Sequence, residues 1–361
     1  MKKLNKILTV LVSLIVILVS CDRKPLYLQG DTALKINVQV QADISVLWRA
    51  GWQDTLRYNW DESLYGPLFY TLPTTCNVVI FREGDIISET RVQTGKRELI
   101  DVELNNTYDL LIYSKDTPWT QTYYEGGRYY VETPTTKGRA TKNDISKEYD
   151  TVEQPGEVFA MNKKEIHLSN DLSDFEEVIE NGKLVYVYNI DEQLEPVSYI
   201  YVIQFIVVND DGSPYIEAKD IANFTISGIS TKKNMFTNKP VYTGNKQIST
   251  FDIKPGQFFT PDTLVFASRV TILDLLPDDV NSSWTSQVDY LYYTNIDVDT
   301  YNYGEVTGTK DITKQLRENP KGGIINIMIY NSELKNEKPT TGGNSFGIDL
   351  NEWKEHIYDV F

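Results

Sequence analysis

The chain has few of the residues on which most catalytic and metal-binding sites depend. Among its 361 residues there are two histidines and two cysteines. His167 lies in an alternating apolar pattern and His356 lies near the C-terminus, so they form no paired metal-binding motif. Because nucleophilic triads and most zinc sites need histidine, we expect no enzyme activity, no metal site and no cofactor. A glycosidase-type pair of carboxylates stays open, since acidic residues are abundant.

The sequence also lacks phosphate-binding loops and an excess of positive charge. Neither of the glycine-rich motifs that bind nucleotide phosphates occurs. The formal net charge is −16, and the acidic residues are scattered along the chain, which is typical of a solvated surface. A chain of this charge has no electrostatic attraction for nucleic acid or for anionic lipid head groups. We therefore expect no nucleic-acid partner.

The N-terminus carries the one long apolar run, at Ile7–Val19, behind a head that is rich in lysine. The run is shorter than the roughly 20 apolar residues of a membrane-spanning helix, and it suits a secretory signal peptide. Ser20 and Cys21 follow it, and a cysteine after a small residue resembles the bacterial lipobox. We predict a lipoprotein signal peptide at residues 1–20, cleavage after Ser20 and lipidation of Cys21. An ordinary signal peptide with an incidental cysteine and an N-terminal anchor helix are the alternatives.

Lipidation would place the protein at the outer membrane, held by acyl chains such as palmitate on its N-terminal cysteine. We expect it to lie on the cell surface, and a position facing the periplasm is the alternative. Cys76 would then be the only other cysteine, so no internal disulfide can form. It begins an apolar run and is predicted to be a buried core residue.

Composition and patterning predict an all-β protein. The chain has 24 Tyr, 13 Phe and 6 Trp but only 4 Met, and aromatic residues favour strands. Leu34–Ala42 alternates between apolar and polar residues, as a half-buried strand does. Regularly spaced strand segments separated by turns predict two β-sandwiches of immunoglobulin-like architecture. We expect a tether at 21–32, an N-terminal sandwich at 33–174 and a C-terminal sandwich at 175–361.

Aromatic residues supply the candidate contacts for a ligand or partner. The segment Ile44–Pro73 is long and rich in aromatic residues, and we expect it to fold over an edge of the sandwich. Exposed tyrosine and tryptophan rings stack on sugars and dock proteins, although packing within the sandwich is the alternative use. The candidates are Trp48, Trp52 and Trp60 in this segment, and Tyr124 and Tyr129 in a predicted hairpin.

A short motif, Asp-Thr followed by an aliphatic residue, occurs four times. It resembles the O-glycosylation acceptor of Bacteroidetes envelope proteins, although roughly one or two matches are expected by chance. The candidate acceptors are Thr32, Thr55, Thr151 and Thr263.

The chain as a whole resembles Bacteroidales lipoproteins related to fimbrillins and fimbrial anchor subunits. The resemblance covers nearly the full length. The segments that carry it are Cys21 with Leu34–Ala42, Leu110–Thr117, Pro155–Ala160, Ala222–Gly228, Asp311–Thr313 and Gly347–Trp353.

This resemblance implies two transthyretin-like sandwiches in an outer-membrane lipoprotein that anchors, caps or joins a fimbria-like polymer. Partner subunits would bind by strand addition. Polymerising members are trimmed after an arginine, and Arg49 and Arg57 lie in the right region, although an anchor would not need that cut. The Ile44–Pro73 segment is longer than the family leads us to expect. We predict a non-catalytic adhesion or structural lipoprotein, with a glycan-binding surface lipoprotein as the alternative.

Overall fold

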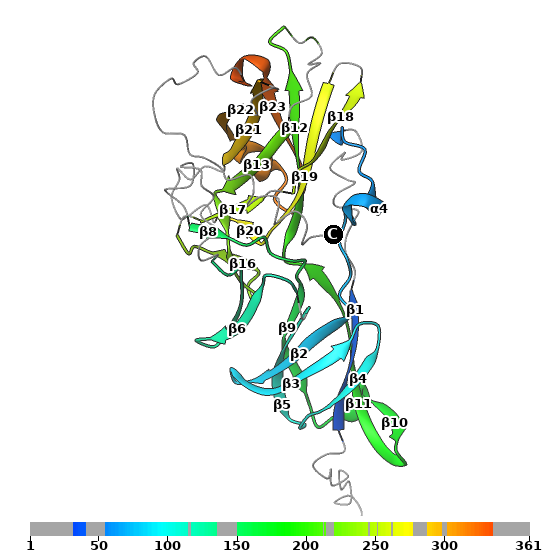
Figure 1. Ribbon diagram of the computed structural model, residues 1–361. Helices are drawn as coiled ribbons and strands as arrows, with labels where there is room; N and C mark the ends of the chain where they lie inside the picture. The colour runs from blue at the N-terminus through cyan, green and yellow to red at the C-terminus, as the bar shows by residue number, and fades with distance from the viewer. Residues whose placement is uncertain are drawn as a thin grey trace, which may run out of the picture.

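The computed structural model describes residues 32–40, 55–114, 117–135, 150–211, 213, 220–244, 246–250, 252–260, 263–276, 287–297 and 302–334. Within these ranges the chain is almost entirely strand, which confirms the all-β fold class. Two groups of sheets lie end to end, with the N-terminal strands at one end and the C-terminal sheets at the other (Figure 1).

The N-terminal half is an eight-stranded sheet that folds over one core. Its strand order is β3-β2-β5-β9-β11-β1-β4, and β10 pairs with β11. β1 lies parallel to β11 and antiparallel to β4, and its alternate residues Leu34, Ile36 and Val38 are fully buried. The alternation predicted the strand correctly. The strands are β1 (Thr32–Val40), β2 (Thr75–Arg82), β3 (Asp85–Gln93), β4 (Arg97–Asp101), β5 (Asn106–Ser114), β9 (Phe159–Leu168), β10 (Glu176–Glu180) and β11 (Lys183–Pro196).

The C-terminal half packs a four-stranded sheet against a five-stranded sheet. The first has the order β18-β19-β12-β23 and the second the order β22-β21-β13-β17-β8. A core of buried aliphatic and aromatic side chains contains residues of both sheets. The strands are β8 (Asp150–Val152), β12 (Tyr199–Val208), β13 (Asp220–Ser227), β17 (Lys246–Thr250), β18 (Lys254–Thr260), β19 (Thr263–Ile272), β21 (Gln287–Asp297), β22 (Asn302–Asp311) and β23 (Gly323–Tyr330).

β12 is buried on both of its faces. Tyr201, Ile203 and Phe205 face the core between the two sheets. Val202 and Ile206 face the other side of their sheet, where a second apolar cluster covers them. A strand that is covered on both faces has apolar side chains on both, so its sequence is a continuous apolar run. This explains why apolar and polar residues do not alternate in β12.

The second cluster is formed by residues 55–70, which connect two N-terminal strands yet lie on the C-terminal sheet. The segment contains the short helix α4 (Glu62–Tyr65), and Tyr58 and Leu68 are buried against the sheet. The side chain of Gln204 accepts a hydrogen bond from the Arg57 N–H at 2.7 Å and donates one to the Thr55 carbonyl at 2.9 Å. The segment therefore covers a sheet face of the other half, which is more than the edge contact that the sequence predicted.

A small sheet of order β16-β15-β7-β6 joins the two halves. β7 comes from the N-terminal half and pairs with β15 from the C-terminal half. An apolar cluster beneath it contains Phe81 and Tyr129 together with Met235 and Leu273. The strands are β6 (Gln121–Glu125), β7 (Arg128–Glu132), β15 (Lys232–Asn234) and β16 (Lys239–Val241), and the nearby pair is β14 (Ile229–Ser230) with β20 (Asp274–Leu275).

The chain crosses for the last time from the first half to the second just after β11. The expected domain boundary near residue 175 lies before β10, in the short helix η2 (Leu172–Asp174) and the residue that follows it. β10 and β11 are hydrogen-bonded into the N-terminal sheet, and the C-terminal sheet begins at β12. The remaining short helices, α5 (Thr313–Glu318) and η3 (Asn331–Leu334), flank β23.

Lys233 is fully buried at this crossing. Its ammonium group donates to the Val197 carbonyl and to the Tyr199 hydroxyl, each at 3.1 Å, and pairs with the Asp274 carboxylate at 2.9 Å. The Tyr199 ring centroid lies 4.6 Å from the same nitrogen, within cation–π range. A buried ammonium group is tolerated because all of these partners compensate for its lost hydration.

Removal of the Lys233 ammonium group should destabilise the protein strongly. We expect Lys233→Met to lower the free energy of unfolding by about 3–5 kcal/mol, because the Asp274 carboxylate loses its partner in a largely buried site. Urea unfolding measures the change. Lys314→Met is the control, since its side chain is 89% exposed, and we expect a change within about 0.5 kcal/mol. Equal unfolding midpoints for the two variants would contradict the assignment.

Candidate functional site

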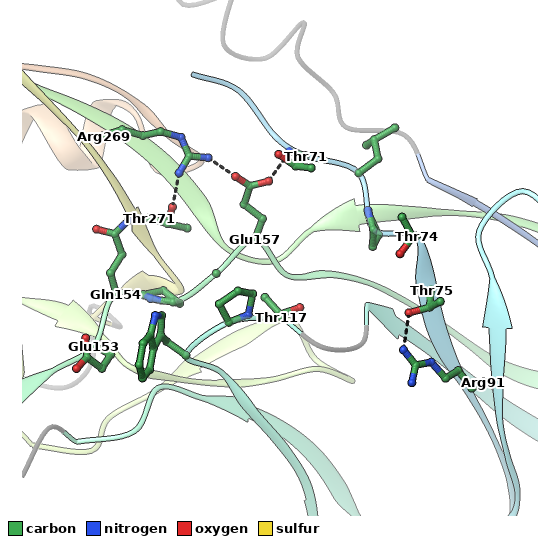
Figure 2. Close-up of a pocket in the computed structure, with 16 residues that line it drawn as sticks. Thr71, Thr74, Thr75, Arg91, Thr117, Glu153, Gln154, Glu157, Arg269 and Thr271 are labelled. Atoms are coloured by element: carbon green, nitrogen blue, oxygen red, sulfur yellow. Dashed lines mark hydrogen bonds and ion pairs between the residues drawn. The ribbon is translucent and has the colours of Figure 1, made fainter. Parts of the chain in front are cut away.

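A cleft of about 660 Å³ lies where the two halves meet. Its lining residues come from the end of the 55–70 segment and the residues after it, from the turn before β6, from the residues that precede β9, and from β3 and β19. The volume lies within the roughly 300–1,000 Å³ of typical ligand sites. Polar groups from both halves surround this space (Figure 2).

An ion pair between Arg269 and Glu157 forms one wall of the cleft. Arg269 lies on β19 and Glu157 lies just before β9, so the pair joins the two halves. Figure 2 shows the two side chains pointing toward one another, with Thr71 beside the carboxylate. The Thr71 N–H donates to Glu157, and Arg269 donates to the Leu68 carbonyl at 3.0 Å and to the Thr271 hydroxyl at 3.2 Å. The pair therefore also fixes the end of the segment that covers the C-terminal sheet.

An exposed tryptophan also lines the cleft. Trp119 follows Pro118 in the turn before β6, and it is 62% exposed. Its φ angle is +52°, in the left-handed region that glycine and asparagine favour. The Thr120 hydroxyl closes the turn with a 2.8 Å hydrogen bond to the Thr117 carbonyl. A left-handed conformation costs about 1–2 kcal/mol for an ordinary residue. Because the Trp119 ring is largely exposed, its burial offsets little of this cost.

Gly156 holds this turn in place. Its N–H donates to the Pro118 carbonyl at 2.9 Å. A Cβ atom at residue 156 would lie 2.6 Å from the Thr117 methyl group and 2.8 Å from the Pro118 carbonyl oxygen. Only glycine permits so close an approach, so the position of the tryptophan is set by backbone packing and not by its own side chain.

Tyr70 is a partly buried residue close to the cleft. Its hydroxyl donates to the Ser198 carbonyl at 3.0 Å, and its ring packs edge-on against Phe159 at 5.5 Å. Burial raises the pKa of Tyr70 well above its ordinary value, so the hydroxyl stays protonated. Its role here is to donate a hydrogen bond across the junction.

Of the aromatic candidates from the sequence, the described ones do not form one surface. The Trp60 indole donates to the Gly66 carbonyl at 3.0 Å and packs against Tyr65 inside the 55–70 segment. Tyr124 is 38% exposed and donates to the Gly84 carbonyl at 2.6 Å. Tyr129 is only 4% exposed and belongs to the apolar cluster beneath the small sheet.

The four candidate acceptor threonines lie in different environments. Thr32 is 6% exposed, and its hydroxyl donates to the Val102 carbonyl at 2.8 Å. Thr55 is exposed, whereas Thr151 and Thr263 are partly buried. The Thr151 hydroxyl also accepts a 3.1 Å hydrogen bond from Gln247. Their glycosylation stays a prediction, and Thr55 is the most accessible of the four.

Several predicted positions lie outside the described residues, namely Ser20, Cys21, Trp48, Arg49 and Trp52. Among the helices that the structure describes, none is both long and apolar enough to cross a membrane. The described ranges also contain no cluster of three or more potential metal-ligating side chains.

Cys76 is fully buried and free, which confirms it as a core residue. Burial raises the pKa of its thiol, and the raised pKa disfavours the reactive thiolate. A structural and unreactive cysteine fits this environment.

No signal in the sequence singled out Trp119. It lies in the run Thr117-Pro118-Trp119-Thr120, where proline indicates a turn, but a left-handed φ is not visible from residue types. The close approach of Gly156 is also a tertiary contact.

Comparison with known proteins gives similarity at the level of the fold. No protein-family model matches the chain, and no curated protein matches it. A candidate adhesin from Bacteroides ovatus aligns with 85% of this chain and 95% of its own, at 13% identity and a TM-score of 0.46. A candidate adhesin from Bacteroides thetaiotaomicron aligns with 72% and 85%, at 10% identity and a TM-score of 0.43.

The fimbrial anchor protein Mfa2 from Porphyromonas gingivalis aligns with 77% of this chain and 97% of its own, at 10% identity and a TM-score of 0.34.

A double-mutant cycle tests the ion pair at the junction. We expect Arg269→Ala to lower the free energy of unfolding by about 3–5 kcal/mol, because it leaves the Glu157 carboxylate largely buried without a cation. In the Arg269→Ala variant, Glu157→Ala should lower the free energy of unfolding by less than it does in the wild type. The difference, which is the coupling energy of the pair, should be about 0.5–3 kcal/mol. Arg97→Ala, at an exposed position on β4, is the control and should change stability by less than about 0.5 kcal/mol. Strict additivity of the two changes in the cycle would show that the pair contributes no coupling.

Proposed function

We propose that the protein is a non-catalytic cell-envelope lipoprotein that serves as an anchor or accessory subunit of a fimbria-like surface assembly. The observation that carries the proposal is the direction in which the chain enters the fold. The N-terminal strand begins at the end of the molecule that lies away from the C-terminal sheets (Figure 1). A lipid on Cys21 would therefore hold the N-terminal half near the membrane and direct the C-terminal half outward.

The strand register supports this polarity. Thr32 pairs with Tyr186 of β11, and Val40 pairs with Leu194. β11 ends at Pro196, where the chain crosses into the C-terminal sheet. At about 3.3 Å per residue, the start of β1 lies roughly 30 Å from that crossing along the strand. β12 then continues outward from the crossing, which lengthens the molecule away from its N-terminal entry.

The outer end of the C-terminal sheet offers a surface for a partner. β18 and β23 are the edge strands of this sheet, and no described strand pairs with their outer edges. Phe258 and Phe259 on β18 are 54% and 55% exposed, and Tyr330 on β23 is 42% exposed. Phe258 and Tyr330 lie at the level of the last residues of β12, the end farthest from the crossing. An exposed edge with apolar side chains suits strand addition by another subunit.

Substitution of the predicted lipidated cysteine tests the membrane attachment. In a Bacteroidales host, Cys21→Ser should move the protein from the membrane fraction to the soluble fraction and abolish labelling with palmitate. The reason is that the acyl chains on Cys21 would be the anchor, whereas the alternative, an N-terminal anchor helix, would keep Cys21→Ser in the membrane fraction. Cys76→Ser is the matched control, because it removes the buried cysteine and should leave the protein in the membrane fraction. Retention of Cys21→Ser in that fraction would overturn the proposal.

Substitution at the outer edge tests the assembly role. Phe258→Asp and Phe259→Asp should each reduce cross-linking to partner subunits in the envelope by tenfold or more, because a charge at an apolar contact opposes docking. Leu64→Asp is the control, since Leu64 is 72% exposed but lies on α4. Unchanged cross-linking in both phenylalanine variants would exclude this edge as the contact.

A further inference from the structure

We propose that the cleft at the junction of the two halves binds an uncharged saccharide, with the ring of Trp119 as its stacking platform. This activity is separate from the anchoring role, since it uses the junction and not the outer edge. Trp119 lines the cleft and is 62% exposed, although tryptophan is usually well buried. Tryptophan has a large, rigid apolar face, and a sugar ring presents a matching face of C–H groups.

The backbone at Trp119 argues for a role beyond closing a turn. Glycine or asparagine would adopt its φ of +52° with less strain. Strained residues of this kind gather at ligand sites, where the surrounding fold holds them in place. Here the surrounding fold is visible, because Gly156 packs directly against Thr117 and Pro118 and hydrogen-bonds the turn. The ring therefore stands on a fixed base, which lowers the entropy lost when a ligand stacks on it.

The other groups of the cleft suit hydroxyl-rich ligands. Thr71, Thr74 and Gln154 line it together with Glu153, so hydroxyl, amide and carboxylate groups face the same space. These groups both donate and accept hydrogen bonds, as a sugar hydroxyl does. A ligand pocket of this type combines an aromatic face with a few placed polar groups.

The charge of the cleft favours an uncharged ligand over an acidic one. Its two arginines, Arg91 and Arg269, are balanced by Glu153 and Glu157. Arg269 is already paired with Glu157, and Arg91 donates to the Thr75 hydroxyl at 3.2 Å. The cleft thus offers no surplus positive charge, and the protein as a whole carries a net charge of −16. Both features disfavour the binding of sialylated sugars, sulfated sugars and uronic acids, which are negatively charged.

The test uses the purified full-length protein on an array that carries neutral and acidic oligosaccharides. We expect the wild type to bind neutral members and Trp119→Gly to lose at least tenfold in affinity for them. Glycine suits the left-handed conformation, so this variant should melt at the same temperature as the wild type or higher. A loss of binding without a loss of stability cannot be attributed to misfolding. Trp119→Tyr, which retains an aromatic face, should keep part of the affinity.

Tyr242→Ala is the control, since it removes an aromatic side chain that is 44% exposed and does not line the cleft, and it should bind like the wild type. The proposal is overturned if the wild type binds no neutral oligosaccharide, if it binds only acidic ones, or if Trp119→Gly binds as tightly as the wild type. These outcomes leave membrane attachment through Cys21 and cross-linking through β18 unaffected, so the two proposals can fail separately.

Discussion

The arrangement of the two halves depends on one buried ammonium group. Lys233 joins the crossing residues Val197 and Tyr199 to Asp274, which belongs to a different strand. Without these partners, the ammonium group would be an uncompensated charge in a fully buried site, which is strongly destabilising. The three contacts therefore form together, and they fix the backbone at the point where the first sandwich ends and the second begins. The small joining sheet and the cleft both lie around this point.

Connections between the halves extend on either side of that crossing. The 55–70 segment leaves the N-terminal half, covers a face of the C-terminal sheet and returns, and Gln204 binds its backbone as a neighbouring strand would. Arg269 and Glu157 fasten its end. Because the halves are joined by these several contacts, their motion relative to one another would cost free energy. Two domains in one chain are usually expected to move relative to one another. The rigidity of the junction is what allows a cleft there to keep a defined shape.

Sequence reasoning predicted the features that depend on local patterning. The alternation within β1 follows from the burial of one face of the strand, and the apolar run of β12 follows from burial on both faces. Features that depend on distant contacts were not predicted. The aromatic content of 55–70 did not show that it covers the other half, and Tyr129 was a surface candidate that lies in the core. Trp119 was missed because its importance lies in a backbone angle and in the approach of Gly156.

The parallel pairing of β1 with β11 has a mechanical consequence. A pull on the chain at Thr32, directed away from the molecule, acts along the axis of β1 and tends to slide it past its neighbours. Hydrogen bonds of a ladder lie across the strand, so the bonds to β11 and to β4 would bear such a load together and not one after another. A strand loaded in this way resists far more force than one peeled from its end. The fold therefore places a strand that is loaded along its own axis directly behind the point where a tether would pull.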